Sequence, residues 1–413
     1  MKAPGEHYDI VIAGGGMIGS CLALALQPLN LRVAVIEPVP ASAETQPSFD
    51  DRTTALSRSS KRMFEAMGLW DQILPATTPI RHIHVSDKGR FGFSHIDAEE
   101  QGVEALGYVV INRTLGSVLA KAREDAKVLD WMCPASVTAT DVHGDKRLVT
   151  VETADGPVEL SCSLLVAADG ARSKVRDMAG ISARHVSYDQ KAIVGNLMSQ
   201  KPLDNRAFER FTSEGPLALL PMADERAAFI WTLSEANADA MLALPDEQFV
   251  ERLQADFGTR LGSFDRVGKR AAYPLVLSKA HGLFAQRAVM VGNAAHGLHP
   301  VAAQGYNLGM RDIASLCDCL FDNQTELGAA FDPGADELLQ QYAEWRKPDQ
   351  GKLVDFTDGL VRLFGDARGP VKLLRNVGML AFDIIPGVRN TFARHTMGLA
   401  GRLPRLSRGL PLQ

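Results

Sequence analysis

Residues 8–20 read Tyr-Asp-Ile-Val-Ile-Ala-Gly-Gly-Gly-Met-Ile-Gly-Ser, and residues 31–37 read Leu-Arg-Val-Ala-Val-Ile-Glu. The first stretch is an apolar run that enters a turn with Gly14, Gly16 and Gly19 in G-x-G-x-x-G spacing. In such a turn the first glycine permits a tight bend, the second lets the backbone approach a pyrophosphate, and the third lets the next helix pack close to the strand. Together with the second apolar run, the motif predicts a strand–turn–helix–strand unit that binds a dinucleotide.

Glu37 ends the second apolar run, about 20 residues past the last glycine of the motif, where an acidic side chain can accept hydrogen bonds from ribose hydroxyls. The free N–H groups at the start of the intervening helix would face the phosphates. The alternative is a glycine-rich turn that holds no ligand. The first strand, the glycine turn, the helix, the second strand and Glu37 follow one another at the expected spacing. This order favours a bound dinucleotide over an empty turn.

The composition indicates an ordinary globular protein. The 413 residues are long enough for two or three domains, and 46% are hydrophobic and 23% charged. A net charge of −5 gives no reason to expect a nucleic-acid partner. No signal peptide is expected, because the first strand begins at Tyr8, and no uncharged apolar run approaches the roughly 18–20 residues of a membrane-spanning helix. The five scattered cysteines favour free, buried thiols in a cytoplasmic protein, and they are Cys21, Cys133, Cys162, Cys317 and Cys319.

Two polar groups in the first third of the chain have simple structural explanations. The stretch 49–57 contains two aspartates and Arg52 just before a helical pattern, and these residues could cap that helix. His82, His84 and His95 lie among strand-like residues without a carboxylate or cysteine that would complete a metal-binding pattern, so no metal site is expected.

Two further side chains point to a bound ligand, and Arg113 to a phosphate in particular. Arg113 lies in the first turn of a helix that the pattern predicts from Ile111 to about Ala126, where a cation is unfavourable for the helix dipole. Asp169 follows a buried strand at Leu164–Ala168, and open α/β sheets place their ligands at such strand ends.

The second half of the chain first shows the pattern of a separate domain and then returns to the pattern of the nucleotide-binding domain. Residues 183–280 contain strand-like runs and a helix near 246–257, which predicts a second, sheet-built domain. Residues 288–312 contain a short apolar strand that ends at Gly292-Asn293, a loop through Pro300, and a helix that opens near Gln304-Gly305. His296 and His299 lie in that loop, where packing or backbone hydrogen bonding is expected rather than catalysis.

These motifs together resemble the group A flavoprotein aromatic hydroxylases, which have the para-hydroxybenzoate-hydroxylase fold. The stretches 49–57 and 304–312 are similar to the ubiquinone-biosynthesis hydroxylases, nearest the 2-polyprenyl-6-methoxyphenol hydroxylase branch. The resemblance covers residues 8–312, and the last hundred residues match only in general character.

The resemblance implies an α/β fold: a Rossmann-like FAD-binding domain, an inserted β-sheet substrate domain and a helical C-terminal region. The expected boundaries are residues 1–80, 111–182 and 284–345 for the FAD-binding domain, 81–110 and 183–283 for the substrate domain, and 346–413 for the C-terminal region.

The resemblance also implies roles for individual residues. The FAD pyrophosphate would be held by Gly14, Gly16 and Gly19, and the adenosine ribose by Glu37. Arg52 would lie near the phosphate–ribityl side of the flavin, Arg113 would contact a phosphate, and Asp169 would serve both FAD and NAD(P)H. The ribityl chain would be bound by Gly292 and Asn293, and the isoalloxazine would be lined by Pro300, Gln304, Gly305 and Asn307. No catalytic side chain is assigned, although Pro300, Gln304 and Gly305 are candidates for the flavin environment. Asn293 replaces the usual aspartate of the family and Ala303 a usual glycine. An amide still binds a hydroxyl, but without charge-assisted strength.

The implied reaction uses NAD(P)H to reduce FAD, after which dioxygen gives a flavin 4a-hydroperoxide that hydroxylates the ring of a polyprenylated phenol. A helix N-terminus at Gln304-Gly305 would stabilise the negative charge on reduced flavin. The base that deprotonates the phenol is left unassigned. Two other functions are kept open: a hydroxylase or reductase of another aromatic or isoprenoid substrate, and a non-catalytic FAD-binding scaffold in a ubiquinone-biosynthesis complex.

The C-terminal tail has two interpretations. Residues 384–413 contain five arginines and no acidic residue, namely Arg389, Arg394, Arg402, Arg405 and Arg408. An apolar helical face precedes them, formed by Leu373, Val377, Leu380, Ala381 and Ile384. This pattern suits peripheral contact with an anionic membrane surface. The alternative is a tail packed on the FAD-binding domain with its arginines in solvent.

Overall fold

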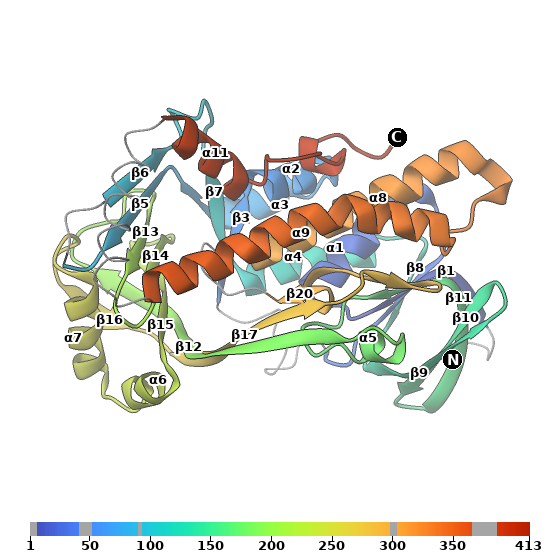
Figure 1. Ribbon diagram of the computed structural model, residues 1–413, viewed down its shortest axis with the longest axis horizontal. Coiled ribbons are helices and arrows are strands. Elements are labelled where there is room, and N and C mark those ends of the chain that lie inside the picture. Colours follow the sequence, from blue (N-terminus) through green and yellow to red (C-terminus); the bar gives the residue numbers. More distant parts are fainter. Residues whose placement is uncertain (1–5, 41–51, 90–92, 298–303, 366–385) are drawn as a thin grey trace.

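The computed structural model describes residues 6–40, 52–89, 93–297, 304–365 and 386–413, and all structural statements below refer to these ranges. A largely parallel sheet occupies one end of the long axis, a nine-stranded sheet occupies the other, and α8 and α9 run lengthwise between them (Figure 1). A third sheet has three strands.

The parallel sheet has the strand order β18-β19-β11-β1-β2-β8, and β10 and β9 extend it beyond β11. β1 lies in the middle, paired in parallel with β2 on one side and β11 on the other. The strands are β1 (Glu6–Ala13), β2 (Val33–Ile36), β8 (Leu129–Met132), β9 (Ala135–His143), β10 (Lys146–Thr153), β11 (Gly156–Ala167), β18 (Phe284–Ala285) and β19 (Ala288–Met290).

The nine-stranded sheet takes strands from separate parts of the chain, in the order β20-β17-β12-β15-β14-β13-β5-β6, with β16 beside β12. These strands are β5 (His82–Asp87), β6 (Phe93–Asp97), β12 (Ala183–Ser199), β13 (Arg206–Phe211), β14 (Pro216–Pro221), β15 (Arg226–Ser234), β16 (Phe264–Val267), β17 (Ala271–Ala280) and β20 (His296–Gly297). The small sheet has the order β3-β7-β4 and contains β3 (Thr53–Ser57), β4 (Thr77–Ile80) and β7 (Gly107–Ile111).

The helices are α1 (Met17–Ala25), α2 (Arg58–Ala66), α3 (Trp70–Ile73), α4 (Asn112–Glu124), α5 (Lys174–Met178), α6 (Glu235–Leu242), α7 (Asp246–Phe257), α8 (Gly305–Leu327), α9 (Asp336–Gly365) and α11 (Pro386–Thr396). Within the described ranges, none of them is both long and apolar enough to cross a membrane.

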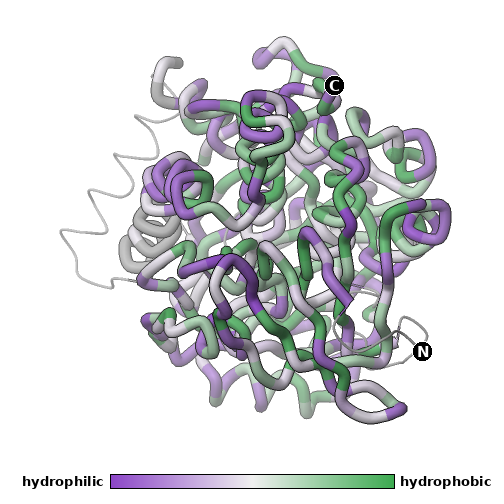
Figure 2. Tube along the Cα trace, turned by 90° about the vertical axis from the view of Figure 1, so that its right-hand side faces the viewer, coloured by the Kyte–Doolittle hydropathy of each residue, from purple (hydrophilic) through white to green (hydrophobic). Residues whose placement is uncertain are grey.

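Alternation along β1 explains how the parallel sheet builds two cores. Ile10 and Ile12 point to the face covered by α1 and α8, whereas Val11 and Ala13 point to the opposite face. All four side chains are at most 3% exposed. Hydrophilic residues collect on the outer turns and hairpin ends, and the segments through the middle are mostly hydrophobic (Figure 2).

The predicted α/β fold is confirmed, and two strands are longer than the sequence pattern indicates. The runs predicted at 158–163 and 164–168 form one strand, β11, whose first half pairs antiparallel with β10 and whose second half pairs parallel with β1. No turn residue separates the two runs, so the strand continues from one partner to the next. β12 likewise begins at Ala183, well before the run at 192–198 that the sequence pattern marks. The domain boundaries stay a prediction.

The cap predicted for α2 is wrong. β3 lies between Arg52 and the helix, and Ser57 is the N-cap residue, whose hydroxyl accepts from the Ser60 N–H at 3.2 Å. The two aspartates of this stretch, Asp50 and Asp51, lie outside the described residues.

Candidate cofactor site

The glycine turn lies at the carboxyl end of β1 and is too tight for side chains. Gly14 has φ +102°, and an added Cβ would lie 2.5 Å from the Ala168 carbonyl oxygen. At Gly19 the added Cβ would lie 1.8 Å from the Gly14 carbonyl oxygen, so α1 packs directly on the turn. Gly16 is the N-cap of α1, with no side-chain cap and no acidic residue in the first turn. The first N–H groups of this nine-residue helix are thus left for an anion.

Glu37 directly follows β2, as predicted, and the residue is 7% exposed. One oxygen accepts from the Gly15 N–H at 2.6 Å, and the other accepts from the Val39 N–H at 2.9 Å. Glu37 therefore fixes the shape of the glycine turn, and its contact with a ribose stays a prediction. Trp131 also borders this turn, because a Cβ on Gly15 would lie 2.3 Å from its ring.

Asp169 follows β11, next to the glycine turn, where the Ala168 N–H donates to the Ala13 carbonyl. One oxygen of its carboxylate accepts from the Val175 N–H at 3.2 Å, and the other, Oδ1, is buried without a hydrogen-bond partner in the described structure. Arg176, which is 2% exposed, joins this turn to the next one by donating to the Ala171 and Ala294 carbonyls at 3.3 Å. The sequence marked a basic helix start here but assigned no role to Arg176.

Gly292 and Asn293 follow β19 and lie beside these two turns. Gly292 has φ +57°, and its N–H donates to Asp312 Oδ2 at 3.1 Å. The Asn293 side chain is exposed, so its amide is accessible to a ligand. Asp312 thereby ties α8 to the strand end that carries the predicted ribityl contacts.

His296 makes a side-chain hydrogen bond, which corrects the expectation of packing or a backbone hydrogen bond. Its Nε2 lies 2.6 Å from Asp312 Oδ2, and both side chains are at most 1% exposed. Arg346 Nε donates to the other Asp312 oxygen at 2.8 Å, and so does Gln350 at 2.9 Å. Burial alone would raise the pKa of Asp312, but the charges and hydrogen bonds of His296 and Arg346 lower it to about 2. His299 lies outside the described residues.

The start of α8 closes the site on a third side. Gln304 is 8% exposed and donates to the Thr396 carbonyl at 3.3 Å, whereas a Cβ on Gly305 would meet no atom of the described residues within 4 Å. The Asn307 amide accepts from Ser57 N–H and Ser60 hydroxyl at 2.8 Å and donates to the Ala55 carbonyl at 2.9 Å. Asn307 thus holds α8 against β3, a role that the sequence did not predict. Pro300 and Ala303 lie outside the described residues.

The two predicted arginines lie on other elements around the same region. The guanidinium of Arg52, just before β3, lies 4.7 Å from the centre of the Tyr273 ring on β17, so the small sheet meets the nine-stranded sheet there. Arg113 is exposed in the first turn of α4, where the sequence placed it. Their contacts with FAD stay predictions.

These residues fit a bound dinucleotide. The tight glycine turn, the uncapped N-terminus of α1, the unpaired Asp169 Oδ1 and the open space at Gly305 come from four elements that meet beside the carboxyl end of β1. In FAD the pyrophosphate would take the N–H groups of α1, and hydroxyls would supply donors to Asp169.

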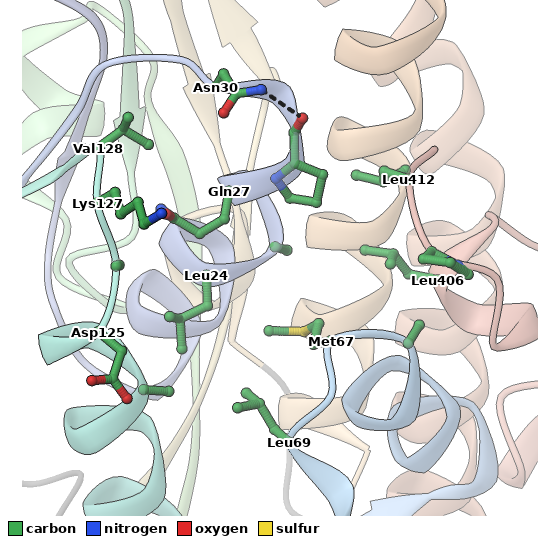
Figure 3. A pocket seen from close by; sticks show the side chains of 16 residues that line it. Leu24, Gln27, Asn30, Met67, Leu69, Asp125, Lys127, Val128, Leu406 and Leu412 are labelled. Atoms are coloured by element: carbon green, nitrogen blue, oxygen red, sulfur yellow. Dashed lines mark hydrogen bonds between the residues drawn. The ribbon is translucent and has the colours of Figure 1, made fainter.

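Other predicted or apparent sites lie elsewhere. His82 and His84 lie on β5 and His95 on β6, and no group of metal-ligating side chains is present in the described ranges. All five cysteines are free, as predicted, although Cys133 is only partly buried. A pocket of about 430 Å³ lies between the ends of α1, α2 and α4 and the C-terminal segment (Figure 3). None of the predicted cofactor residues lines it.

The C-terminal segment packs on the rest of the protein. Leu406 and Leu412 belong to the main core around α1 and α8. Arg405 pairs with Asp322 at 2.7 Å, Arg389 pairs with Glu100 at 3.1 Å, and Arg402 lies 3.8 Å from the Trp345 ring centre. Arg394 and Arg408 are exposed. The apolar face predicted at 373–384 lies outside the described residues.

Comparison with known proteins agrees with this site. A family model described as "FAD binding domain" matches residues 7–357. The chain is 38% identical over 408 residues to ubiquinone hydroxylase UbiL of Rhodospirillum rubrum, which covers 98% of this chain and 93% of the relative. It is 30% identical over 400 residues to 3-demethoxyubiquinol 3-hydroxylase of Escherichia coli, covering 95% of this chain and 99% of the relative.

A solved structure shares the fold. The crystal structure of p-nitrophenol 4-monooxygenase PnpA from Pseudomonas putida DLL-E4 superposes with a TM-score of 0.79 at 17% identity, covering 96% of this chain and 99% of that one. The chain therefore belongs to the FAD-binding-domain family of flavoprotein monooxygenases, which confirms the resemblance found in the sequence. It is an FAD-dependent aromatic hydroxylase, and NAD(P)H and dioxygen are the usual co-substrates of this family.

Proposed function

We propose that this member of the family hydroxylates the ring of a polyprenylated phenol during ubiquinone biosynthesis. The observation that carries the proposal is the similarity to ubiquinone hydroxylase UbiL, which extends over 98% of this chain at 38% identity. The second relative, 3-demethoxyubiquinol 3-hydroxylase, belongs to the same biosynthesis by its name and is also matched over nearly its full length.

The chain's own residues supply binding, orientation and a sheltered site. The chemistry that bound FAD supplies is acceptance of a hydride from NAD(P)H and activation of dioxygen for transfer of one oxygen atom to the ring. The N–H groups at the start of α1 would hold the pyrophosphate, and Asp169 would accept from a hydroxyl through its unpaired Oδ1. The uncharged N-terminus of α8 at Gly305 would favour negative charge on the ring system.

Side chains between the small sheet and the nine-stranded sheet would keep water from the reacting ring. Ile80 and Val109 of the small sheet pack with Ala207, Leu220 and Ala228 of the nine-stranded sheet. This apolar contact joins the small sheet, which begins just after Arg52, to the nine-stranded sheet, and would exclude water from that side of the site.

Deletion of the gene in the native host tests the substrate. We expect ubiquinone to fall and a polyprenylated intermediate that lacks one ring hydroxyl to accumulate, as identified by mass spectrometry. Reintroduced wild type should restore ubiquinone, and Asp169→Ala should restore less. Unchanged ubiquinone in the deletion strain, without such an intermediate, would favour another aromatic or isoprenoid substrate.

Peripheral membrane contact and a place in a biosynthetic complex belong to the same proposal, since a polyprenylated phenol is nearly insoluble in water. Three of the five tail arginines already contact protein groups, so the exposed Arg394 and Arg408 carry the electrostatic part of the proposed membrane contact. Removal of residues 402–413 is a poor test, because Leu406 and Leu412 are core residues.

A double variant, Arg394→Gln with Arg408→Gln, is the better test. We expect wild type to co-sediment with anionic liposomes at low salt and the double variant to bind several-fold more weakly while keeping FAD. A protein that ignores anionic liposomes at low salt would require a partner protein to deliver the substrate.

A further inference from the structure

One row of side chains across the nine-stranded sheet contains a single carboxylate. Cross-strand pairing aligns Val194 with Ile230, Ile230 with Ala218, Ala218 with Glu209, and Glu209 with Val85. Residues directly opposite one another in a ladder project from the same face. Glu209 on β13 therefore lies in the middle of an apolar row.

This face is the one that turns toward the cofactor residues. Tyr273, which lies under the Arg52 guanidinium, pairs with Ala192 in the neighbouring row of the same face. Ala207, two residues before Glu209, packs against the small sheet that begins just after Arg52. The opposite face is covered by α7, where Phe208 and Trp231 pack with Phe249.

The surroundings of Glu209 leave its carboxyl without a protein partner. No hydrogen bond or ion pair reaches it from the described residues, and burial raises its pKa to about 7 without a contribution from any charged neighbour. The side chain is nevertheless partly accessible, so it borders open space rather than tight packing. Two other polar atoms of this face, the hydroxyls of Thr232 and Ser94, are also buried without partners in the described structure.

The described residues place few charged groups on this side of the sheet. Asp87 lies on the neighbouring strand β5, Arg52 stacks on Tyr273, and Arg226 at the far end of β15 pairs with Asp224. An unpaired carboxyl in an apolar surface costs stability, and such groups cluster at functional sites. Its position therefore points to a ligand that supplies a hydrogen-bond donor.

We propose that Glu209 binds the hydroxyl of the substrate phenol and accepts its proton. This assignment rests on the proposed function. The O–H bond of the phenol breaks, its proton forms an O–H bond with the Glu209 carboxylate, and the electron pair stays on the phenol oxygen. No oxidant or reductant takes part in this step, and the proton returns to the oxygen when the product leaves.

Deprotonation makes the ring a better nucleophile toward an electrophilic oxygen. An ordinary glutamate has a pKa near 4.3, far below that of a phenol near 10. A base that titrates near 7 accepts such a proton more readily and is still partly ionised at neutral pH. Burial in the apolar row supplies this property without a further side chain.

The first test needs no turnover. The oxidised, FAD-loaded enzyme is mixed with 2-methoxyphenol without NAD(P)H, and phenolate is followed by difference absorbance across pH 5–9. We expect bound phenolate to appear in wild type at lower pH than in free solution, to be lost in Glu209→Gln, and to return in part in Glu209→Asp. Glu159→Gln, the same change at an exposed position of β11, is the matched control and should behave as wild type. An identical phenolate titration in wild type and Glu209→Gln would overturn the proposal.

The second test uses hydroxylation of a short-chain prenylphenol. Because Glu209 must be ionised to accept a proton, kcat should rise with pH through about 7 in wild type. In Glu209→Gln this rise should vanish and kcat should fall about 100-fold, with flavin content unchanged. If wild type hydroxylates and Glu209→Gln keeps both rate and pH profile, the Glu209 assignment fails while the proposed function stands. If wild type makes no hydroxylated product, the proposed function fails, and the phenolate titration still decides on Glu209.

Discussion

Gly19 and Gly305 both lie beside the proposed cofactor, but their surroundings differ. A Cβ on Gly19 would lie 1.8 Å from the Gly14 carbonyl oxygen, whereas a Cβ on Gly305 would meet no atom within 4 Å in the part of the chain that the structure describes. Protein contacts therefore require glycine at position 19. At position 305 the described residues leave room for a Cβ and for a ligand.

Alanine substitutions separate these two requirements. Gly19→Ala should destabilise the FAD-free protein by about 2 kcal/mol or more, because the backbone must shift. Gly305→Ala should leave the FAD-free protein as stable as wild type, or slightly more stable, and lower FAD affinity. Urea unfolding and flavin fluorescence titration measure the two effects. FAD affinity unchanged in Gly305→Ala would place the flavin away from α8.

The buried Asp312 carboxylate contacts the Arg346 guanidinium, the His296 ring and the Gly292 N–H. Asp312→Asn should cost about 3 kcal/mol, because the buried Arg346 loses one of its two carboxylate partners and keeps Asp349, which is partly exposed. Asp239→Asn removes an exposed partner of Lys191 and should cost no more than about 1 kcal/mol. Equal losses for the two variants in urea unfolding would show that the buried pairs add little.

Single residues were predictable from the sequence where a motif fixes their neighbours. The spacing of Gly14, Gly16 and Gly19 and the position of Glu37 follow from one local unit, and the structure places them at one turn. Asp312 and His296 were not, because their partners come from distant parts of the chain. Glu209 belongs to no sequence motif. Its apolar surroundings could not be predicted, because they come from five strands that are brought together only in the folded sheet.

The element that shows a conflict between folding and binding most directly is α4. Its first turn carries Arg113, which the helix dipole disfavours, and its last turn carries Lys121 and Arg123, which the dipole favours. A phosphate of the bound cofactor near Arg113 would offset the unfavourable interaction of Arg113 with the helix dipole.

Alanine variants of α4 should therefore respond in opposite ways. Arg113→Ala should lower FAD affinity several-fold while the FAD-free protein becomes more stable by about 0.3–1 kcal/mol. Lys121→Ala, at the other end of the helix, should lose a few tenths of a kcal/mol and keep its FAD affinity. Flavin titration and thermal unfolding give both values. Arg113 has no part in the cofactor site if its alanine variant binds FAD as wild type does.

At the level of helices and strands, the sequence predicted most elements near the cofactor site. The helix from Asn112, the strand before Asp169 and the helix opening at Gly305 were all expected, because each has a clear apolar pattern and a defined start. The strand β3 was missed, since the two aspartates and Arg52 of this stretch were interpreted as a cap of the helix that follows. Its pairing with β7 depends on residues that are far away in sequence.

Across the whole molecule, the Glu209 carboxyl couples folding to pH. Its pKa rises from 4.5 to about 7 on folding, so the folded state binds the proton more tightly than the unfolded state. Stability from this group is thus fully present below about pH 4.5 and is lost as pH rises to 7, by roughly 3 kcal/mol in all.

A glutamine at position 209 removes this coupling. Glu209→Gln should match wild type in stability near pH 4.5 and exceed it by roughly 3 kcal/mol above pH 7, because the amide carries no charge to desolvate. Urea unfolding of the FAD-free proteins at several pH values gives the difference. A gap between the two proteins that does not change with pH would show that Glu209 titrates normally.

The central claim is that the molecule couples NAD(P)H oxidation on bound FAD to hydroxylation of a prenylated phenol. The most direct measurement supplies the purified, FAD-loaded enzyme with NAD(P)H, a short-chain prenylphenol and isotopically labelled dioxygen, and follows the product by mass spectrometry. The account predicts a ring-hydroxylated product with one labelled oxygen atom and NAD(P)H oxidation that the phenol stimulates. A protein that binds no FAD, or one that oxidises NAD(P)H without placing labelled oxygen on the ring, would contradict it.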